Sequence, residues 1–93
     1  MEKIEYINGS FTIPFEDDGL LGYVSIHPEM VPAKYGVSPT GRYLVLCQHP
    51  QQGSCWFILE QDENCEWFSE VNPPFISQGF IRWIADRIEY KNH

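Results

Sequence analysis

The clearest hydrophobic pattern lies in the middle of the chain, where two runs, 43–49 and 55–61, flank a turn and a third, 66–71, follows. Each run is apolar at odd and even positions alike. With His49 paired to Cys55, alternation along the strands divides the side chains between two faces. The first face carries Tyr43, Val45, Cys47, His49, Cys55, Phe57, Leu59 and Phe68, and the second carries Leu44, Leu46, Trp56, Ile58, Trp67 and Val71. Neither face is polar, so this sheet needs two covers.

Shorter β-type runs precede this hairpin. The runs 4–6 and 11–15 flank an Asn-Gly dipeptide, which is typical of a two-residue hairpin turn. Pro14 has no N–H to donate and therefore places its run at a sheet edge. The run 20–27 predicts a further strand, in which Gly22 indicates a bulge or a close approach of the backbone.

Prolines and glycines interrupt the segment 28–41, which predicts a long loop. Its larger apolar residues are Met30, Val31, Tyr35 and Val37. These side chains either fold down over the sheet as a lid or stay exposed as a contact loop. The sequence leaves both arrangements open.

The end of the chain predicts an amphipathic helix over 75–91. Its apolar residues recur every three to five positions and are Ile76, Phe80, Ile81, Ile84 and Ile88. Either Ser77 or Asn72 is suited to cap its N-terminus.

These elements predict a single α+β domain over 1–93. It is a curled antiparallel β-meander of about six strands, half-barrel-like, with the C-terminal amphipathic α-helix packed on it. Curling would bury one face of the central hairpin inside the sheet while the helix covers the other. The order of elements is similar to that of the pleckstrin-homology-like architecture, but no motif accompanies that order, so it implies no function.

Charge narrows the range of partners. The chain has 13 acidic and 6 basic residues, a net charge of -7, and no Lys or Arg between 43 and 81. This charge repels phosphate backbones and anionic lipids, so we expect neither direct nucleic-acid binding nor membrane attachment. An odd number of cysteines and a start without the pattern of a secretory signal favour a cytoplasmic location.

Three side chains suited to metal or thiol chemistry share the first predicted face, namely Cys47, His49 and Cys55. Their spacing matches no standard zinc motif, and buried cysteines often serve as small hydrophobic residues. We therefore predict no cofactor, no metal and no catalytic residue. A small metal-binding or thiol-dependent enzyme that uses these three residues remains an alternative.

The second predicted face pairs Trp56 with Trp67 beside an acidic turn. These tryptophans are either core residues under the helix or anchors for a partner with a basic surface. The candidate partner-binding residues are Trp56, Trp67, Glu60, Asp62, Glu63, Glu66, Met30 and Tyr35.

The leading interpretation is a small, acidic, non-catalytic cytoplasmic protein that binds another protein, as an inhibitor, an immunity-type protein or an accessory factor. In one variant its carboxylates imitate nucleic-acid phosphates on the target. The alternative from another class is a structural homodimer that uses an exposed sheet face.

Overall fold

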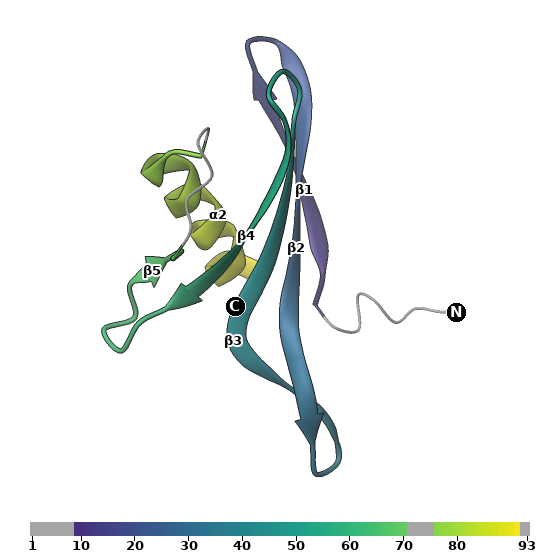
Figure 1. The fold of residues 1–93 in the computed structure, drawn as a ribbon, viewed down its shortest axis with the longest axis vertical. Coiled ribbons are helices and arrows are strands. Elements are labelled where there is room, and N and C mark those ends of the chain that lie inside the picture. Colours follow the sequence, from purple (N-terminus) through teal and green to yellow (C-terminus); the bar gives the residue numbers. More distant parts are fainter. Residues whose placement is uncertain (1–8, 71–75, 92–93) are drawn as a thin grey trace.

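The computed structural model describes residues 9–70 and 76–91, which form one antiparallel sheet of five strands and one helix. The elements are β1 (Phe11–Asp17), β2 (Leu20–Ala33), β3 (Gly36–His49), β4 (Gly53–Gln61), β5 (Trp67–Phe68) and α2 (Gln78–Lys91). Neighbouring strands follow chain order, and the sheet is not closed (Figure 1). The predicted α+β meander with a C-terminal helix is confirmed. The predicted run 4–6 lies outside the described residues.

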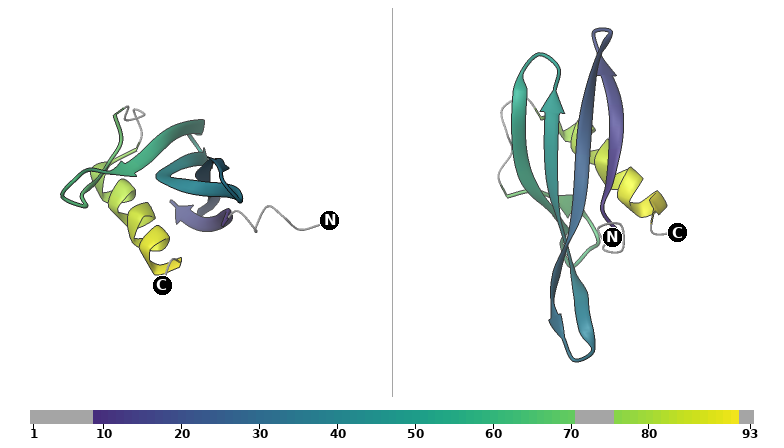
Figure 2. Two further views of the ribbon diagram at one scale, coloured as in Figure 1. Left: turned by 90° about the horizontal axis from the view of Figure 1, so that it is seen from below. Right: turned by 90° about the vertical axis from the view of Figure 1, so that its right-hand side faces the viewer.

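Helix α2 lies across one side of the sheet, which we call the covered face (Figures 1 and 2). The strand side chains buried there are Val24, Ile26, Val45, Cys47, Phe57 and Leu59, each at most 1% exposed. The helix buries Ile81, Ile84, Ala85 and Ile88 against them, and Ile76 lies just before it. Alternation along the strands and the helical apolar stripe together build this core.

Ser77 caps the start of α2. Its Oγ accepts the backbone N–H of Phe80 at 3.1 Å, and its carbonyl accepts that of Ile81 at 3.1 Å. One of the two predicted caps is therefore confirmed, and the other, Asn72, lies outside the described residues. The helix begins at Gln78, and position 75 of the predicted range also lies outside them.

The other side of the sheet, which we call the open face, has no second layer in the part of the chain that the structure describes. Its exposed side chains include Leu21 (52%), Tyr23 (43%), Leu46 (40%) and Trp56 (64%). The expectation that both faces would be covered is wrong for these residues. The sheet stays open, and the helix covers one side only.

The predicted loop 28–41 is wrong, because β2 and β3 continue through it as a paired hairpin that we call the arm. Its pairs run from Met30–Pro39 to Ala33–Gly36, after a register shift between Pro28 and Met30. In a two-stranded ribbon each strand has one neighbour, so a proline is tolerated where its nitrogen faces solvent. Residues 31–42 are all exposed, and the arm projects away from the helix-covered part instead of folding back as a lid (Figure 2).

The central hairpin differs from the prediction in register but not in its faces. His49 pairs with Gly53, and Cys47 pairs with Cys55. This two-residue shift leaves every side chain of β3 and β4 on the predicted face. The third strand is shorter than predicted and pairs Phe68 with Glu60, which exchanges the faces expected for its residues.

Candidate functional site

The open face presents an apolar surface over β3 and β4. Three cross-strand rows make it up, namely Tyr23–Gln48–Ser54, Ser25–Leu46–Trp56 and His27–Leu44–Ile58. Trp56 is the most exposed of its large apolar side chains. Leu44, Leu46, Trp56 and Ile58 are neighbours in two of these rows and form its apolar part, with Ser25, His27, Gln48 and Ser54 beside them. An apolar patch with a polar surround is typical of an interaction site.

A hollow of about 500 Å³ lies beside Trp56. It is lined by Arg42, Trp56, Phe57, Ile58, Glu60, Ser69 and Glu70. The Arg42 guanidinium lies 3.8 Å from the Glu60 carboxylate and 3.5 Å from the Glu29 carboxylate. The hollow therefore combines an apolar wall with a charged rim, which suits a long side chain from a partner.

Trp67 does not belong to this surface. Its indole N–H donates a hydrogen bond of 2.7 Å to the Glu89 carboxylate on α2, and its ring lies 5.8 Å from that of Tyr43. The predicted pairing of Trp56 with Trp67 is wrong, because the register of β5 turns Trp67 toward the helix. Trp67 tethers the short strand to α2, and Trp56 alone faces outward.

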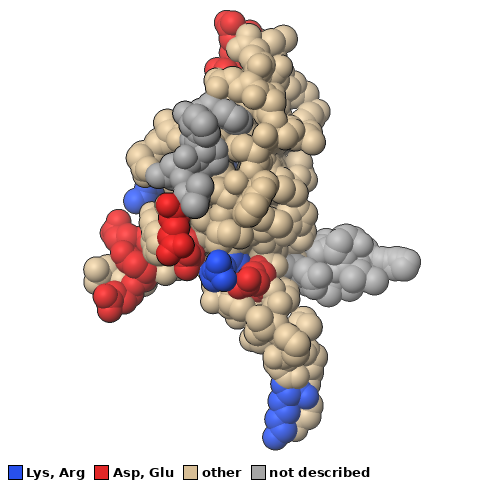
Figure 3. Space-filling model, in the orientation of Figure 1, with Lys and Arg blue, Asp and Glu red and all other residues tan. Residues whose placement is uncertain are grey.

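The acidic turn between β4 and β5 is partly a structural device. The Asp62 carboxylate accepts the backbone N–H groups of Asn64 at 2.8 Å and Glu66 at 2.9 Å, which shapes the turn. Glu63 and Glu66 are exposed, and acidic side chains gather over this turn (Figure 3). Of the four predicted acids, Glu60 pairs with Arg42 and Asp62 holds the turn, so Glu63 and Glu66 are the outward-facing charges.

Met30 and Tyr35, the remaining predicted contact residues, lie on the arm. Tyr35 is 91% exposed at its turn, where the Lys34 ammonium lies 5.5 Å from the ring centroid. Met30 is half-buried near the base of the arm. The structure therefore places these two residues on a projection of the sheet and not in a loop that covers it.

The predicted set of Cys47, His49 and Cys55 does not form a metal site. Cys47 and Cys55 are paired across β3 and β4, whereas the His49 ring nitrogens contact Asp17 and the backbone of Gln51 and Gln52. The His49 Nε2 lies 3.0 Å from the Asp17 carboxylate. Across residues 9–70 and 76–91, no three His, Cys, Asp or Glu side chains are arranged to hold a metal ion.

Burial governs the thiol chemistry of the pair. Desolvation, with a smaller contribution from Cys55, raises the pKa of the Cys47 thiol from 9.0 to about 11. Burial also raises the pKa of Cys55, against the opposing effect of its hydrogen bond to Cys47. Neither thiol is activated for nucleophilic attack at neutral pH, because the thiolate is the nucleophile.

The raised pKa predicts how stability depends on pH. Above pH 9 the unfolded chain loses the Cys47 proton while the folded chain keeps it until about pH 11. The free energy of unfolding should therefore fall by up to about 1.4 kcal/mol for each pH unit across this window, in addition to other titrations. Urea unfolding of wild type and Cys47→Ala at pH 8, 9, 10 and 11 measures the difference. Equal pH slopes for the two proteins would contradict the assignment.

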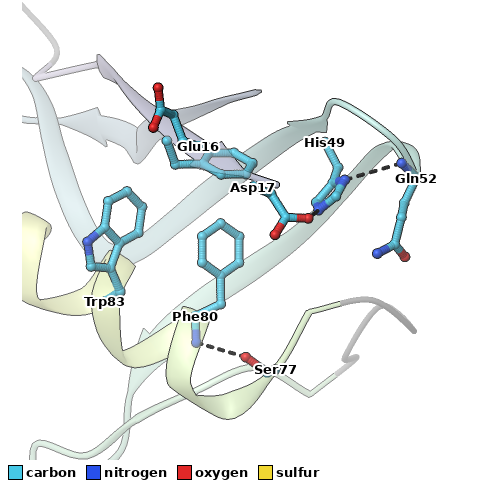
Figure 4. A pocket seen from close by; sticks show the side chains of 8 residues that line it. Glu16, Asp17, His49, Gln52, Ser77, Phe80 and Trp83 are labelled. Carbon is cyan, nitrogen blue, oxygen red and sulfur yellow. Dashed lines mark hydrogen bonds and ion pairs between the residues drawn. The ribbon is translucent and has the colours of Figure 1, made fainter. Parts of the chain in front are cut away.

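A second cavity, of about 640 Å³, lies between the start of α2 and the ends of β1 and β3, and we call it the end pocket (Figure 4). It is lined by Phe15, Glu16, Asp17, His49, Gln52, Ser77, Phe80 and Trp83. The ends of β1 and β3 and the start of α2 meet here. Asp17 ends β1 before a two-residue turn with positive φ at Asp18 (55°) and Gly19 (78°), and His49 ends β3.

Asp17, His49 and Ser77 line the end pocket but do not form a nucleophilic relay. The His49 Nδ1 accepts the backbone N–H groups of Gln51 and Gln52, both at 3.2 Å, so the ring proton lies on Nε2 and is directed to Asp17. Neither ring nitrogen remains to activate Ser77, whose Oγ caps the helix. Sequence reasoning missed this pocket, because its residues are far apart and no local motif joins them.

Comparison with models of protein families, with characterised proteins and with solved structures gives no match to this chain. In the part of the chain that the structure describes, α2 is too short and too polar to cross a membrane.

Proposed function

We propose that this protein binds another protein through the open face, with Trp56 as the anchor. The observation that carries the proposal is the contrast between neighbours on β4, since Phe57 is 1% exposed and Trp56 is 64% exposed. Leu46 lies opposite Trp56 and is 40% exposed. Exposed tryptophan on an apolar surface is a favoured interface anchor, because it buries a large area with little loss of rotamer freedom.

The partner presents a basic side chain to the hollow beside Trp56. Glu60 and Glu70 contribute two carboxylates to this hollow, against the single guanidinium of Arg42. The exposed Glu63 and Glu66 add negative charge on the neighbouring turn. Complementary charge speeds encounter, and burial of Trp56 then slows dissociation. An inhibitory, immunity-type or accessory role would use this same binding surface.

Affinity capture from a lysate of the cells in which the protein naturally occurs tests the proposal, with two variants compared side by side. We expect Trp56→Ala to lower retention of a stoichiometric partner by at least about tenfold. Tyr90→Ala is the matched control, because Tyr90 is also an exposed aromatic residue (79%) but lies on α2. Equal retention by both variants would contradict the use of the open face.

A charge variant tests how much the acidic turn contributes to the rate of association with the partner. The double variant Glu63→Gln with Glu66→Gln leaves Asp62 in place to shape the turn, and it should slow association at low salt only.

Sedimentation of the isolated protein addresses the homodimer alternative. A dimer that Trp56→Ala dissociates would assign the open face to a second copy of this chain.

A further inference from the structure

We propose that the end pocket is a second binding site and that it takes an organic cation, an ammonium or guanidinium group carried on an apolar body. This inference does not rest on the proposed function. The end pocket lies between the covered face and α2, whereas Trp56 lies on the open face. Its volume of about 640 Å³ is within the range of small-molecule sites.

The apolar part of the site is a continuous set of aromatic rings. The Phe15 ring centroid lies 5.9 Å from that of His49 and 5.2 Å from that of Phe80. Phe80 in turn stacks on Trp83 at 5.5 Å, with only 9° between the ring planes. Phe15 comes from β1 and the other two large rings from α2, so the sheet and the helix hold the wall from both sides.

The polar part of the site carries negative charge. Asp17 directs its carboxylate to the His49 side of the cavity, whereas Glu16 points away from Phe80 and Trp83 (Figure 4). The His49 Nδ1 accepts the backbone N–H groups of Gln51 and Gln52, and its Nε2 lies 3.0 Å from the Asp17 carboxylate. The Asp17 side chain is 50% exposed, so a bound cation can reach this carboxylate from the cavity. Among the described residues that line the cavity, none is Lys or Arg.

Aromatic rings and a carboxylate together select a cation over an anion. The negative face of an aromatic ring attracts ammonium and guanidinium groups, and a nearby carboxylate adds a direct charge interaction. The protein already shows this affinity, since its own Arg87 guanidinium lies 5.3 Å from the Trp83 ring centroid. The start of α2 would favour an anion, but Ser77 already accepts the Phe80 N–H there.

Three probes that differ mainly in charge test the site. They are 2-phenylethylammonium, 2-phenylethanol and 3-phenylpropionate, each titrated at neutral pH into the ¹⁵N-labelled full chain and followed by NMR. We expect the ammonium to shift the Trp83 indole N–H and the Gln52 amide in a saturable way, about tenfold more tightly than the alcohol. The carboxylate probe should bind most weakly. Equal binding of all three probes, or shifts confined to other residues, would overturn the proposal.

Two substitutions test whether the Asp17 carboxylate gives the site its preference for the ammonium probe. Asp17→Asn keeps a hydrogen-bond acceptor for His49 but removes the charge, so it should abolish the preference for the ammonium over the alcohol. Asp86→Asn is the matched control, because Asp86 is exposed on α2 and pairs with Arg82 at 3.8 Å. A preference that survives Asp17→Asn would refute the role of this carboxylate. The ordering of the three probes on the wild-type protein tests the site without any variant.

One more probe distinguishes a cation on a protein side chain from a cation on a free small molecule. Nα-acetyl-lysine methylamide presents a lysine side chain as it occurs in a protein. Tighter binding of this probe than of 2-phenylethylammonium would support the site and assign it to a basic side chain of a protein. The reverse order would support the site and assign it to a free aromatic amine.

Discussion

Replacing Phe57 with alanine is expected to lower the free energy of unfolding by about 3 to 5 kcal/mol. The ring is 1% exposed and belongs to the core between β4 and α2, which cannot collapse to fill its volume. Urea unfolding followed by far-UV circular dichroism measures the loss. A residual helical signal with lost cooperativity would also agree, because the sheet and the helix share this core.

Trp56→Ala is the matched control for Phe57→Ala. The two side chains are neighbours on β4, but Trp56 is 64% exposed and should cost less than about 1 kcal/mol. Measurements at low chain concentration keep self-association out of the comparison. Similar losses for both variants would show that the open face is buried in the isolated protein, contrary to the fold described above.

Gly22→Ala is expected to cost about 3 kcal/mol, the upper end of the range for overpacked sites. A Cβ at this position would lie 2.5 Å from the Phe15 ring and 2.7 Å from the Gln48 carbonyl oxygen. The carbonyl is part of the backbone and cannot move aside, so Phe15 or the strand must shift. Because Phe15 also walls the end pocket, the variant should lose binding of 2-phenylethylammonium together with stability.

Gly79→Ala makes the same change where there is room. The nearest atom to its Cβ would be Ser77 Oγ at 3.8 Å, and the position is helical. Alanine should therefore leave stability unchanged or raise it by up to about 1 kcal/mol. Chemical denaturation of the two variants in parallel decides the matter. A loss at Gly79 as large as that at Gly22 would contradict the steric argument.

The sequence was sufficient to predict which side chains of β3 and β4 share a face, but not that one of the two faces stays uncovered. Val45 and Phe57 are buried as expected, although the pairing of His49 was predicted two residues away from its true partner. An even shift in register changes neighbours but never faces. The prediction failed at β5, where the turn contains Cys65 with φ at 65° and changes which residues face α2.

The arm could not be predicted, because prolines are usually signals against a strand. Pro32 and Pro39 interrupt the apolar pattern, yet both lie in paired strands here. A two-stranded ribbon removes the requirement that every backbone N–H be paired, and only the tertiary arrangement shows that these strands have a single neighbour.

The candidate sites differ in whether their residues lie within one strand or far apart in the sequence. Trp56 could be named from the sequence as a candidate contact residue, since aromatic residues in a hydrophobic strand are recognisable locally, but only the structure shows that its side chain is exposed. The end pocket depends on Asp17, His49 and Phe80, which only folding brings together. The role of Asp62 was hidden too, since a turn carboxylate that accepts backbone N–H groups looks the same in sequence as one that faces solvent.

The length of the arm can change without changing the stability of the core. It holds none of the buried core residues, and the Lys34–Tyr35 turn lies at its far end. Deleting or inserting two residues in each of its strands would change its length by about 7 Å and keep every remaining side chain on its face. The distance between Tyr35 and the core can thus vary among sequences of this fold while the packing of α2 on the sheet stays the same.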